Sequence, residues 1–345
     1  MIAGNIVRSS KGLEAEDNRA SIIIPVYNAR KTIEKCLESV FNQSYKDYEI
    51  LVVDNDSTDG SLDILKSFGG EIRLVHEPGR GSFKARNAGV RKAKGDILVF
   101  LDADCITDEK WLENLTKPLI LEGEVAAYGS STDVEQTRWS SLEHRYEESI
   151  VEGFTKGGYT QMGDTKNLAV RKNVFEKLGG FDESFIFSGD TDFGLRLIDA
   201  GYKIRYVSDG MVQHHFKATL RRIIRDKFRH GFWGVKVYSR HKKHLVNYGR
   251  VLHEVKLSAI FLLASILFFS AGMIITTGLA TAFKLISTIS TISSVFMLIG
   301  ANHTTVPIIK NGLTDYNVYG LIHSAAWRGG ALWYILKNPK VWSKI

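Results

Sequence analysis

The stretch of residues 95–104 constrains the fold of this chain most, because it joins a buried strand directly to a pair of carboxylates. Five apolar residues run from 97 to 101, which is typical of a parallel strand covered on both faces. Asp102 and Asp104 follow at once, and side chains two positions apart on an extended segment point to the same side. Open α/β sheets bind ligands at the carboxyl ends of their strands, so this stretch predicts a ligand site.

The residue types at this strand end indicate a metal site for a phosphorylated ligand. Paired carboxylate oxygens suit Mg²⁺ or Mn²⁺, which proteins often hold partly through substrate phosphates. The alternative is a polar turn, since aspartate is common where a strand ends.

The first two expected strands, at residues 20–28 and 49–54, predict a nucleotide pocket at the same edge of the sheet. Asp54 can accept hydrogen bonds from a base, and Tyr27 can stack beside it. The alternatives are a turn or helix-capping acid for Asp54 and a core aromatic for Tyr27.

Phosphate binding must rely on a metal and on basic side chains. The chain has neither a glycine fingerprint GxGxxG after its first strand nor a GxxxxGK[ST] loop, which disfavours a dinucleotide site and a P-loop. Arg80 and Arg86 are candidates for the diphosphate charge, with a solvated surface position as the alternative for each.

Strands and helices alternate through the first third of the chain, which predicts a parallel, doubly wound sheet. Strands are expected at 20–28, 49–54, 72–76 and 97–101, and helices at 31–41, 61–68 and 79–93. Further on we expect helices at 108–121, 171–178 and 190–200, and strands at 125–131 and 202–207. Residues 137–165 show no clear periodicity.

A second acidic cluster lies at the start of the helix expected at 190–200. Asp190 and Asp192 are candidates for a general base that removes a proton from a hydroxyl nucleophile. The alternative is that both acids only complement the helix dipole. His214 and His215 can complete a metal site or bind phosphate, although a structural role is the alternative.

The charge of the chain is concentrated in one block. Of the net +7, residues 221–256 carry +9, from eleven Lys/Arg and two acids, so the rest carries −2. Two uncharged runs follow, 27 residues at 257–283 and 25 at 285–309, and a span needs about 20. With basic residues on both sides, they predict a transmembrane hairpin with both ends in the cytoplasm; an interfacial or re-entrant segment is the alternative for the second run.

Four ordered motifs closely resemble family 2 glycosyltransferases: strand-Pro-Val-Tyr-Asn ending at Asn28, then residues 53–60, 81–89 and 101–104. The resemblance covers roughly residues 21–216. It implies a GT-A fold, a nucleotide-diphosphate sugar donor (UDP or GDP), Mg²⁺ or Mn²⁺, and inversion at the anomeric carbon. The Gln-x-x-Arg-Trp motif of processive synthases is absent, so a non-processive enzyme of glycan biosynthesis is implied.

The resemblance also assigns residues to roles. It implies donor contacts from Pro25, Tyr27, Asn28, Asp54, Asp56, Arg86, Asp102, Ala103 and Asp104, and metal contacts from Asp104, Asp102 and His214. The family begins a helix with an acidic pair that supplies the base; here Gly189 stands first and Asp190 matches the second acid. Asp192 is a substitute candidate, and Asn167 lies in the segment that shapes the acceptor site.

These observations predict a GT-A Rossmann-like, mostly parallel sheet at 20–216 after a leader at 1–19. A basic helical region (217–256), two transmembrane helices (257–309) and an amphipathic cytoplasmic segment with an interfacial helix (310–345) follow. The expected protein is a multi-pass enzyme of the cell membrane with a cytoplasmic catalytic domain. Its expected partners are the donor, a lipid-linked or membrane-associated acceptor and membrane lipids, but no nucleic acid. The alternatives are a membrane-tethered sugar-nucleotide binding module and a sugar-phosphate nucleotidyltransferase.

Overall fold

The computed structural model describes residues 18–161, 163–216, 219–243 and 315–338, and singly 260 and 288. The predicted leader, apart from residues 18 and 19, and the uncharged runs at 257–309, apart from 260 and 288, lie outside the described residues. The domain boundaries predicted from the sequence therefore stay a prediction.

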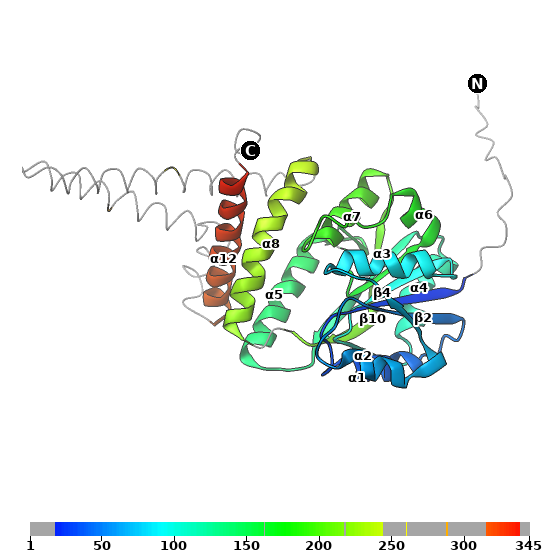
Figure 1. Ribbon diagram of the computed structural model, residues 1–345. Helices are drawn as coiled ribbons and strands as arrows, with labels where there is room; N and C mark the ends of the chain where they lie inside the picture. The colour runs from blue at the N-terminus through cyan, green and yellow to red at the C-terminus, as the bar shows by residue number, and fades with distance from the viewer. Residues whose placement is uncertain are drawn as a thin grey trace, which may run out of the picture.

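The amino-terminal half forms the parallel part of one ten-stranded sheet (Figure 1). Its strands are β1 (Ala20–Val26), β2 (Tyr48–Asp54), β3 (Arg73–His76) and β4 (Ile97–Leu101), in the spatial order β3-β2-β1-β4. The helices between them are α1 (Ile33–Phe41), α2 (Ser61–Ser67) and α3 (Ser82–Lys92), and a 3₁₀ turn covers Gly69–Glu71. The prediction for this half is confirmed.

Two apolar clusters cover the two faces of this sheet, which explains the uninterrupted apolar strands. Alternate residues of β4 divide between them: Val99 and Leu101 pack with α1 and α4 (Trp111–Leu121), while Leu98 and Phe100 pack toward α3 and α7 (Gly189–Asp199). All five residues of β4 are fully buried. Burial on both faces is what a parallel strand requires.

The carboxyl-terminal half of the sheet is mixed, so the expectation of a parallel, doubly wound sheet holds only as far as β4. Strand β9 (Asn167–Arg171) runs antiparallel to β4 and to β6 (Ala126–Asp133), and β10 (Ile204–His214) is parallel to β6. Beyond β10 lies the short hairpin of β8 (Tyr159–Thr160) and β7 (Thr155–Lys156), and β5 (Cys105–Thr107) also pairs with β10. Inserting β9 beside β4 reverses the chain direction at this position.

Two elements of this half were missed by the periodicity argument. Helix α5 (Arg138–Phe154) occupies the stretch without clear periodicity, and Thr137 caps it by accepting a hydrogen bond from Ser140 N at 3.2 Å. Strand β9 precedes α6 (Lys172–Lys177), where only a helix was expected. All five residues of β9 are buried, so it lacks the alternation of polar and apolar residues that identifies a half-exposed strand.

The basic region forms helix α8 (Leu220–Arg240), and the helix expected near the end of the chain is α12 (Asp315–Lys337). The two helices lie side by side (Figure 1). A β-carbon added at Gly231 would lie 1.8 Å from Trp327 O, and one added at Gly330 would lie 1.8 Å from Phe228 O. Glycine on each helix therefore lets the two backbones touch.

The predicted multi-pass membrane localisation is wrong for the part of the chain that is described. Within that part, no helix combines the length and the apolar character that crossing a membrane requires. Helix α12, predicted to be interfacial, instead buries Ala331 and Ile335 in a cluster with Val235 of α8.

Candidate active site

The carboxyl ends of β1, β2 and β4 lie side by side because the strands pair in parallel, Val26 opposite Asp54 and Ile23 opposite Phe100. The segments after these strands carry most of the residues that the sequence singled out. Helix α7 adds Asp190 and the end of β10 adds His214. The sheet thereby gathers residues from distant parts of the chain at one edge.

The segments after β1 and β2 are tied to each other. Asn28 N donates to Ser57 Oγ at 3.1 Å, and Asn28 Oδ1 accepts from Thr58 N at 2.8 Å. Asn28 and Asp56 both adopt left-handed backbone conformations, with φ of 52° and 61°, which asparagine and aspartate tolerate better than other side chains. Asn28 and Asp56 therefore shape the loops rather than simply project into them.

Asp54 is buried at the end of β2, and Asp56 is open to solvent. Ser57 N donates to Asp54 Oδ1 at 3.3 Å, and Gly79 N donates to Asp56 Oδ2 at 2.7 Å. His76 bridges the two acids, with Nδ1 3.6 Å from Asp54 Oδ2 and Nε2 3.4 Å from Asp56 Oδ1. The alternative of a turn acid thus describes part of what Asp54 does.

Tyr27 lies exposed beside this loop, not in the core. It is 41% exposed, and the Arg80 guanidinium lies 5.0 Å from the centre of its ring. Pro25, one residue before the end of β1, is half-buried. An exposed ring with an adjacent cation is suited to stacking with a planar, negatively charged ligand.

Asp102 is paired with Arg86 at the end of β4. Arg86 is buried in α3, its Nη2 donates to Asp102 Oδ1, and its guanidinium lies 5.6 Å from the centre of the Phe83 ring. Burial raises the pKa of Asp102, Arg86 opposes this increase, and the charges of Asp104 and Asp164 add to it. Ala103 is buried between the two aspartates.

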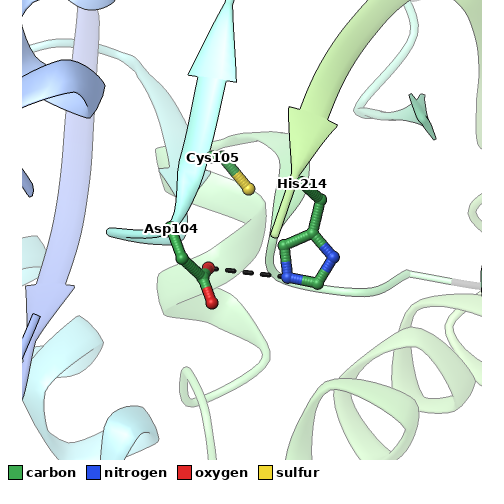
Figure 2. A group of neighbouring side chains, drawn as sticks. All are labelled: Asp104, Cys105 and His214. Atoms are coloured by element: carbon green, nitrogen blue, oxygen red, sulfur yellow. Dashed lines mark ion pairs between the residues drawn. The ribbon is translucent and has the colours of Figure 1, made fainter. Parts of the chain in front are cut away.

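Asp104 and His214 face one another (Figure 2). Asp104 Oδ1 lies 3.5 Å from His214 Nε2, and together with Cys105 they offer ligand atoms within 4.8 Å of one another. The His214 Nδ1 atom is buried and has no hydrogen-bond partner among the described residues, whereas Nε2 of the same ring faces Asp104. The carboxylate suits Mn²⁺ or Mg²⁺ completed by substrate oxygens, and the imidazole is the second ligand group that the structure places beside it.

Cys105 is a poor third ligand, because burial, and then the charge of Asp104, raises the pKa of its thiol well above the ordinary value. A metal binds the thiolate, not the thiol. Asp102, predicted as a second ligand, is outside this group and held by Arg86. The metal-binding candidates are therefore Asp104 and His214.

Asp190 lies in the first turn of α7, in a setting that disfavours its charge. Burial is the main cause that raises its pKa, to about 7, and the charges of Asp164 and Asp102 contribute. Thr191 N donates to Asp190 Oδ1 at 2.7 Å. A carboxyl group that titrates near neutral pH is suited to removing a proton from an alcohol.

The residue before Asp190 explains why the first acid of the expected pair is absent. Gly189 packs against Phe83, and a β-carbon on Gly189 would lie 2.7 Å from the Phe83 ring. Ser188, which precedes it, is in the left-handed region with φ of 62°. The Phe83 ring occupies the space that a longer side chain at position 189 would need.

The two acceptor-side predictions are not supported by where the residues lie. Asp192 is 1% exposed and pairs with Arg196 Nε at 2.9 Å, Arg240 Nη1 at 3.3 Å and His241 Nε2 at 3.1 Å. Asn167 is fully buried; it accepts from Trp111 Nε1 at 2.9 Å and donates to two backbone carbonyls. Both side chains use their polar atoms in contacts within the fold, so their acceptor-side roles stay predictions that these contacts do not support.

Sequence reasoning missed a charged pair beside the site. Lys166 is buried; its Nζ lies 2.7 Å from Glu147 Oε2 and 3.2 Å from Asp164 Oδ2. Burial alone would raise the pKa of Asp164, but the Lys166 charge lowers it below the ordinary value. Glu147 lies on the unrecognised helix α5, so no local pattern pointed to this pair.

Comparisons with known proteins bear on the family and the fold of the chain. The family model described as Glycosyl transferase family 2 matches residues 21–179. Glycosyltransferase AglE of Haloferax volcanii is 33% identical over 229 residues, which are 63% of this chain and 73% of that protein. A dolichyl N-acetyl-α-D-glucosaminyl phosphate 3-β-D-2,3-diacetamido-2,3-dideoxy-β-D-glucuronosyltransferase of Methanococcus voltae is 28% identical over 232 residues, 62% of this chain and 72% of that one.

Among solved structures, the mannosyltransferase PcManGT of Pyrobaculum calidifontis, in complex with GDP-Man and Mn²⁺, matches with a TM-score of 0.60 and 17% identity. The match covers 95% of this chain and 92% of that one. This likeness supports the GT-A Rossmann-like fold. The chain therefore belongs to glycosyl transferase family 2 and is a glycosyltransferase that uses a nucleotide-sugar donor.

Proposed function

We propose that this glycosyltransferase transfers a sugar with inversion to a hydroxyl group of a lipid-linked glycan, with Asp190 as the general base and with metal assistance at Asp104 and His214. The observation that carries the proposal is the Asp190 carboxyl, whose pKa is raised to about 7 beside the paired Asp102 and Arg86. The lipid-linked acceptor rests on the relative from Methanococcus voltae, whose name specifies a dolichyl phosphate sugar.

The donor is proposed to lie along the carboxyl edge of the sheet. Asp54 and the Tyr27 ring are the candidates for the base, and Pro25, Asn28 and Asp56 form the loops around it. Arg80, whose guanidinium lies over Tyr27, carries a positive charge on the diphosphate side.

The leaving diphosphate is proposed to depart near Asp104. A divalent cation bound by Asp104 and His214 would supply positive charge for the developing negative charge of the diphosphate. Arg86 holds Asp102 in place at the same strand end, and Ala103 keeps the segment between the two acids compact and buried.

Asp190 is proposed to accept the proton of the acceptor hydroxyl. The hydroxyl oxygen then attacks the anomeric carbon from the face opposite the diphosphate, a bond to the sugar forms and the bond to diphosphate breaks. This single displacement inverts the anomeric configuration and requires no covalent enzyme intermediate. A base with a pKa near neutrality is half ionised at the pH at which it works.

The test is release of nucleoside diphosphate by the full-length protein. GDP- and UDP-sugars are supplied with Mn²⁺, Mg²⁺ or a chelator, with and without polyprenyl-phosphate glycans. We expect acceptor-dependent release that chelation removes, and a product of inverted anomeric configuration by NMR.

Three variants complete the test. Asp190→Asn and Asp104→Asn should lose transfer, whereas Glu183→Gln, an exposed acid outside the site, is the matched control. Full activity in Asp190→Asn would reject the proposed base, and activity unchanged by chelation would reject metal assistance. Retention of the donor's anomeric configuration would reject the single displacement.

A further inference from the structure

A cavity of about 290 Å³ lies between helix α5 and strands β6 and β10. Its volume is close to the lower limit of roughly 300 Å³ for small-molecule sites, so it suits a ligand of about one sugar ring. Lys166 lines it, and the Lys166 ammonium lies 3.2 Å from Asp164, whose charge acts on Asp190. The cavity is thus linked to the proposed base through Lys166 and Asp164.

The polar groups of the cavity are arranged for hydroxyl groups. Tyr128 is 3% exposed and lines the cavity, and its hydroxyl makes no hydrogen bond to any residue of the described chain. A hydroxyl that lines a cavity without a protein partner is free to pair with a ligand hydroxyl or with water. The Tyr206 ring, 6.3 Å from the Tyr128 ring between centroids, adds a flat apolar surface on which a ring can pack.

The charges of the cavity disfavour an anion. Glu147, Glu148 and Glu152 line it against one cation, Lys166. Lys166 is not available to an anionic ligand, because it already pairs with Glu147 at 2.7 Å and with Asp164 at 3.2 Å. The carboxylates that remain, Glu148 and Glu152, are exposed, and Glu148 lies 3.6 Å from His144 Nε2. They can accept hydrogen bonds from neutral hydroxyls or from an ammonium group, and they disfavour a carboxylate.

From this geometry we infer that the cavity between α5, β6 and β10 is the subsite for the acceptor sugar, and that it selects a neutral or amino sugar over a uronic acid. The inference rests on the proposed function and deepens it. It also replaces Asn167 and Asp192, which are committed to the fold, by Tyr128, Glu148 and Glu152 as the residues that determine acceptor specificity.

The experiment measures binding of three glycosides that share one ring to the full-length protein, by saturation-transfer NMR. The probes are methyl glucoside, methyl glucosaminide and methyl glucuronide, which are neutral, cationic and anionic at pH 7. We expect the first two to bind and the glucuronide not to bind. Equal binding of the glucuronide, or no binding of any glycoside, would overturn the inference.

Variants assign the binding to this cavity. Tyr128→Phe removes an unpartnered hydroxyl and keeps the ring, so the variant should fold normally. It should weaken the binding of methyl glucoside and methyl glucosaminide by about 2- to 10-fold. Tyr48→Phe is the matched control, since its hydroxyl bonds to Val40 O on the opposite face of the sheet. Unchanged binding in Tyr128→Phe would overturn the inference, as would a double Glu148→Gln/Glu152→Gln variant that still rejects the glucuronide.

The same samples separate this inference from the proposed function. Binding of GDP and UDP in the presence of Mn²⁺ reports on the donor edge, which shares no residue with the cavity lining. The expected glycoside pattern is binding of the glucoside and the glucosaminide but not of the glucuronide. If that pattern is not observed while nucleotide binding is intact, the acceptor subsite alone is overturned. Absence of nucleotide binding with the glycoside pattern intact would count against the donor side of the proposed function, while the pattern itself would support the subsite.

Discussion

Two carboxylates in the first turn of α7, only two residues apart, have opposite environments. Asp190 is partly open to the site, with its pKa raised to about 7 chiefly by burial and by the charge of Asp164. Asp192 is 1% exposed and is surrounded by Arg196, Arg240 and His241. The comparison teaches that partners, not position at a helix start, separate an acid suited to catalysis from one that stabilises the fold.

The largest expected effect is on the rate of transfer when the open acid is neutralised. Asp190→Asn should lower kcat by about 10²- to 10⁴-fold, because a positioned base contributes that much. Nucleoside diphosphate release measures the rate, and thermal unfolding checks that the variant is folded. If Asp190→Asn lowered the stability of the protein but left the rate of transfer unchanged, the roles assigned to the two acids would have to be reversed.

The buried acid should show the opposite pattern. Asp192→Asn should lower the free energy of unfolding by about 3 kcal/mol, because Arg240 and His241 lose their buried anion. Urea unfolding measures this loss. The rate per folded molecule should stay within a factor of a few; a loss as large as that of Asp190→Asn would contradict a structural role.

The α8–α12 contact extends the comparison to backbone packing. A β-carbon at Gly330 would lie 1.8 Å from Phe228 O, whereas one at Gly329 would lie 3.6 Å from the Phe228 ring, an ordinary contact. Gly330→Ala should therefore lower the free energy of unfolding by about 1–3 kcal/mol through overpacking. Gly329→Ala is the neighbouring control and should be neutral or stabilising, because alanine favours helix; equal loss in both variants would reject backbone contact as the cause.

The raised pKa of Asp190 also predicts a pH dependence. The base must be ionised, so kcat/KM should fall about tenfold per pH unit below 7 and level off above it. A carboxyl group whose native pKa exceeds its ordinary value of 3.8 binds its proton more tightly when folded. Its contribution to stability is fully present below 3.8 and is lost as the pH rises through 7. Asp190→Asn should remove this dependence, and pH-independent unfolding in the native protein across that window would contradict it.

The smallest expected effect concerns the contact of helices α12 and α8 with Glu143 of α5. Tyr319 of α12 donates to Glu143 Oε2, and Lys227 of α8 approaches the same carboxylate within 2.5 Å at Oε1. Tyr319→Phe should lower the free energy of unfolding by about 1 kcal/mol, the net value of one hydrogen bond. Urea unfolding of the variant against the native protein measures it; an increase in stability would argue against the bond.

The gathering of acids at the carboxyl edge of the sheet was predictable because these residues follow strands that the sequence identifies. Asp54, Asp102 and Asp104 each end or follow an apolar run, and parallel pairing brings such ends to one edge. The acceptor side was not predictable, since Asn167 and Asp192 look polar and available in sequence but are enclosed by Trp111 and by α8. Glu147 lies on α5, which periodicity did not identify, and Lys166 lies 19 positions further on, in the turn before β9.

By itself the sequence determined the parallel half of the sheet, the acids at its carboxyl edge and the family of the enzyme. Local patterns suffice there, because apolar runs and strand–helix alternation reflect burial along the chain itself. Only the tertiary structure decided that β9 reverses the sheet, that α5 closes a cavity on β6 and β10, and that Asp190 is open while Asp192 is paired. These depend on contacts between distant segments, which set burial and charge around a side chain without leaving a local pattern.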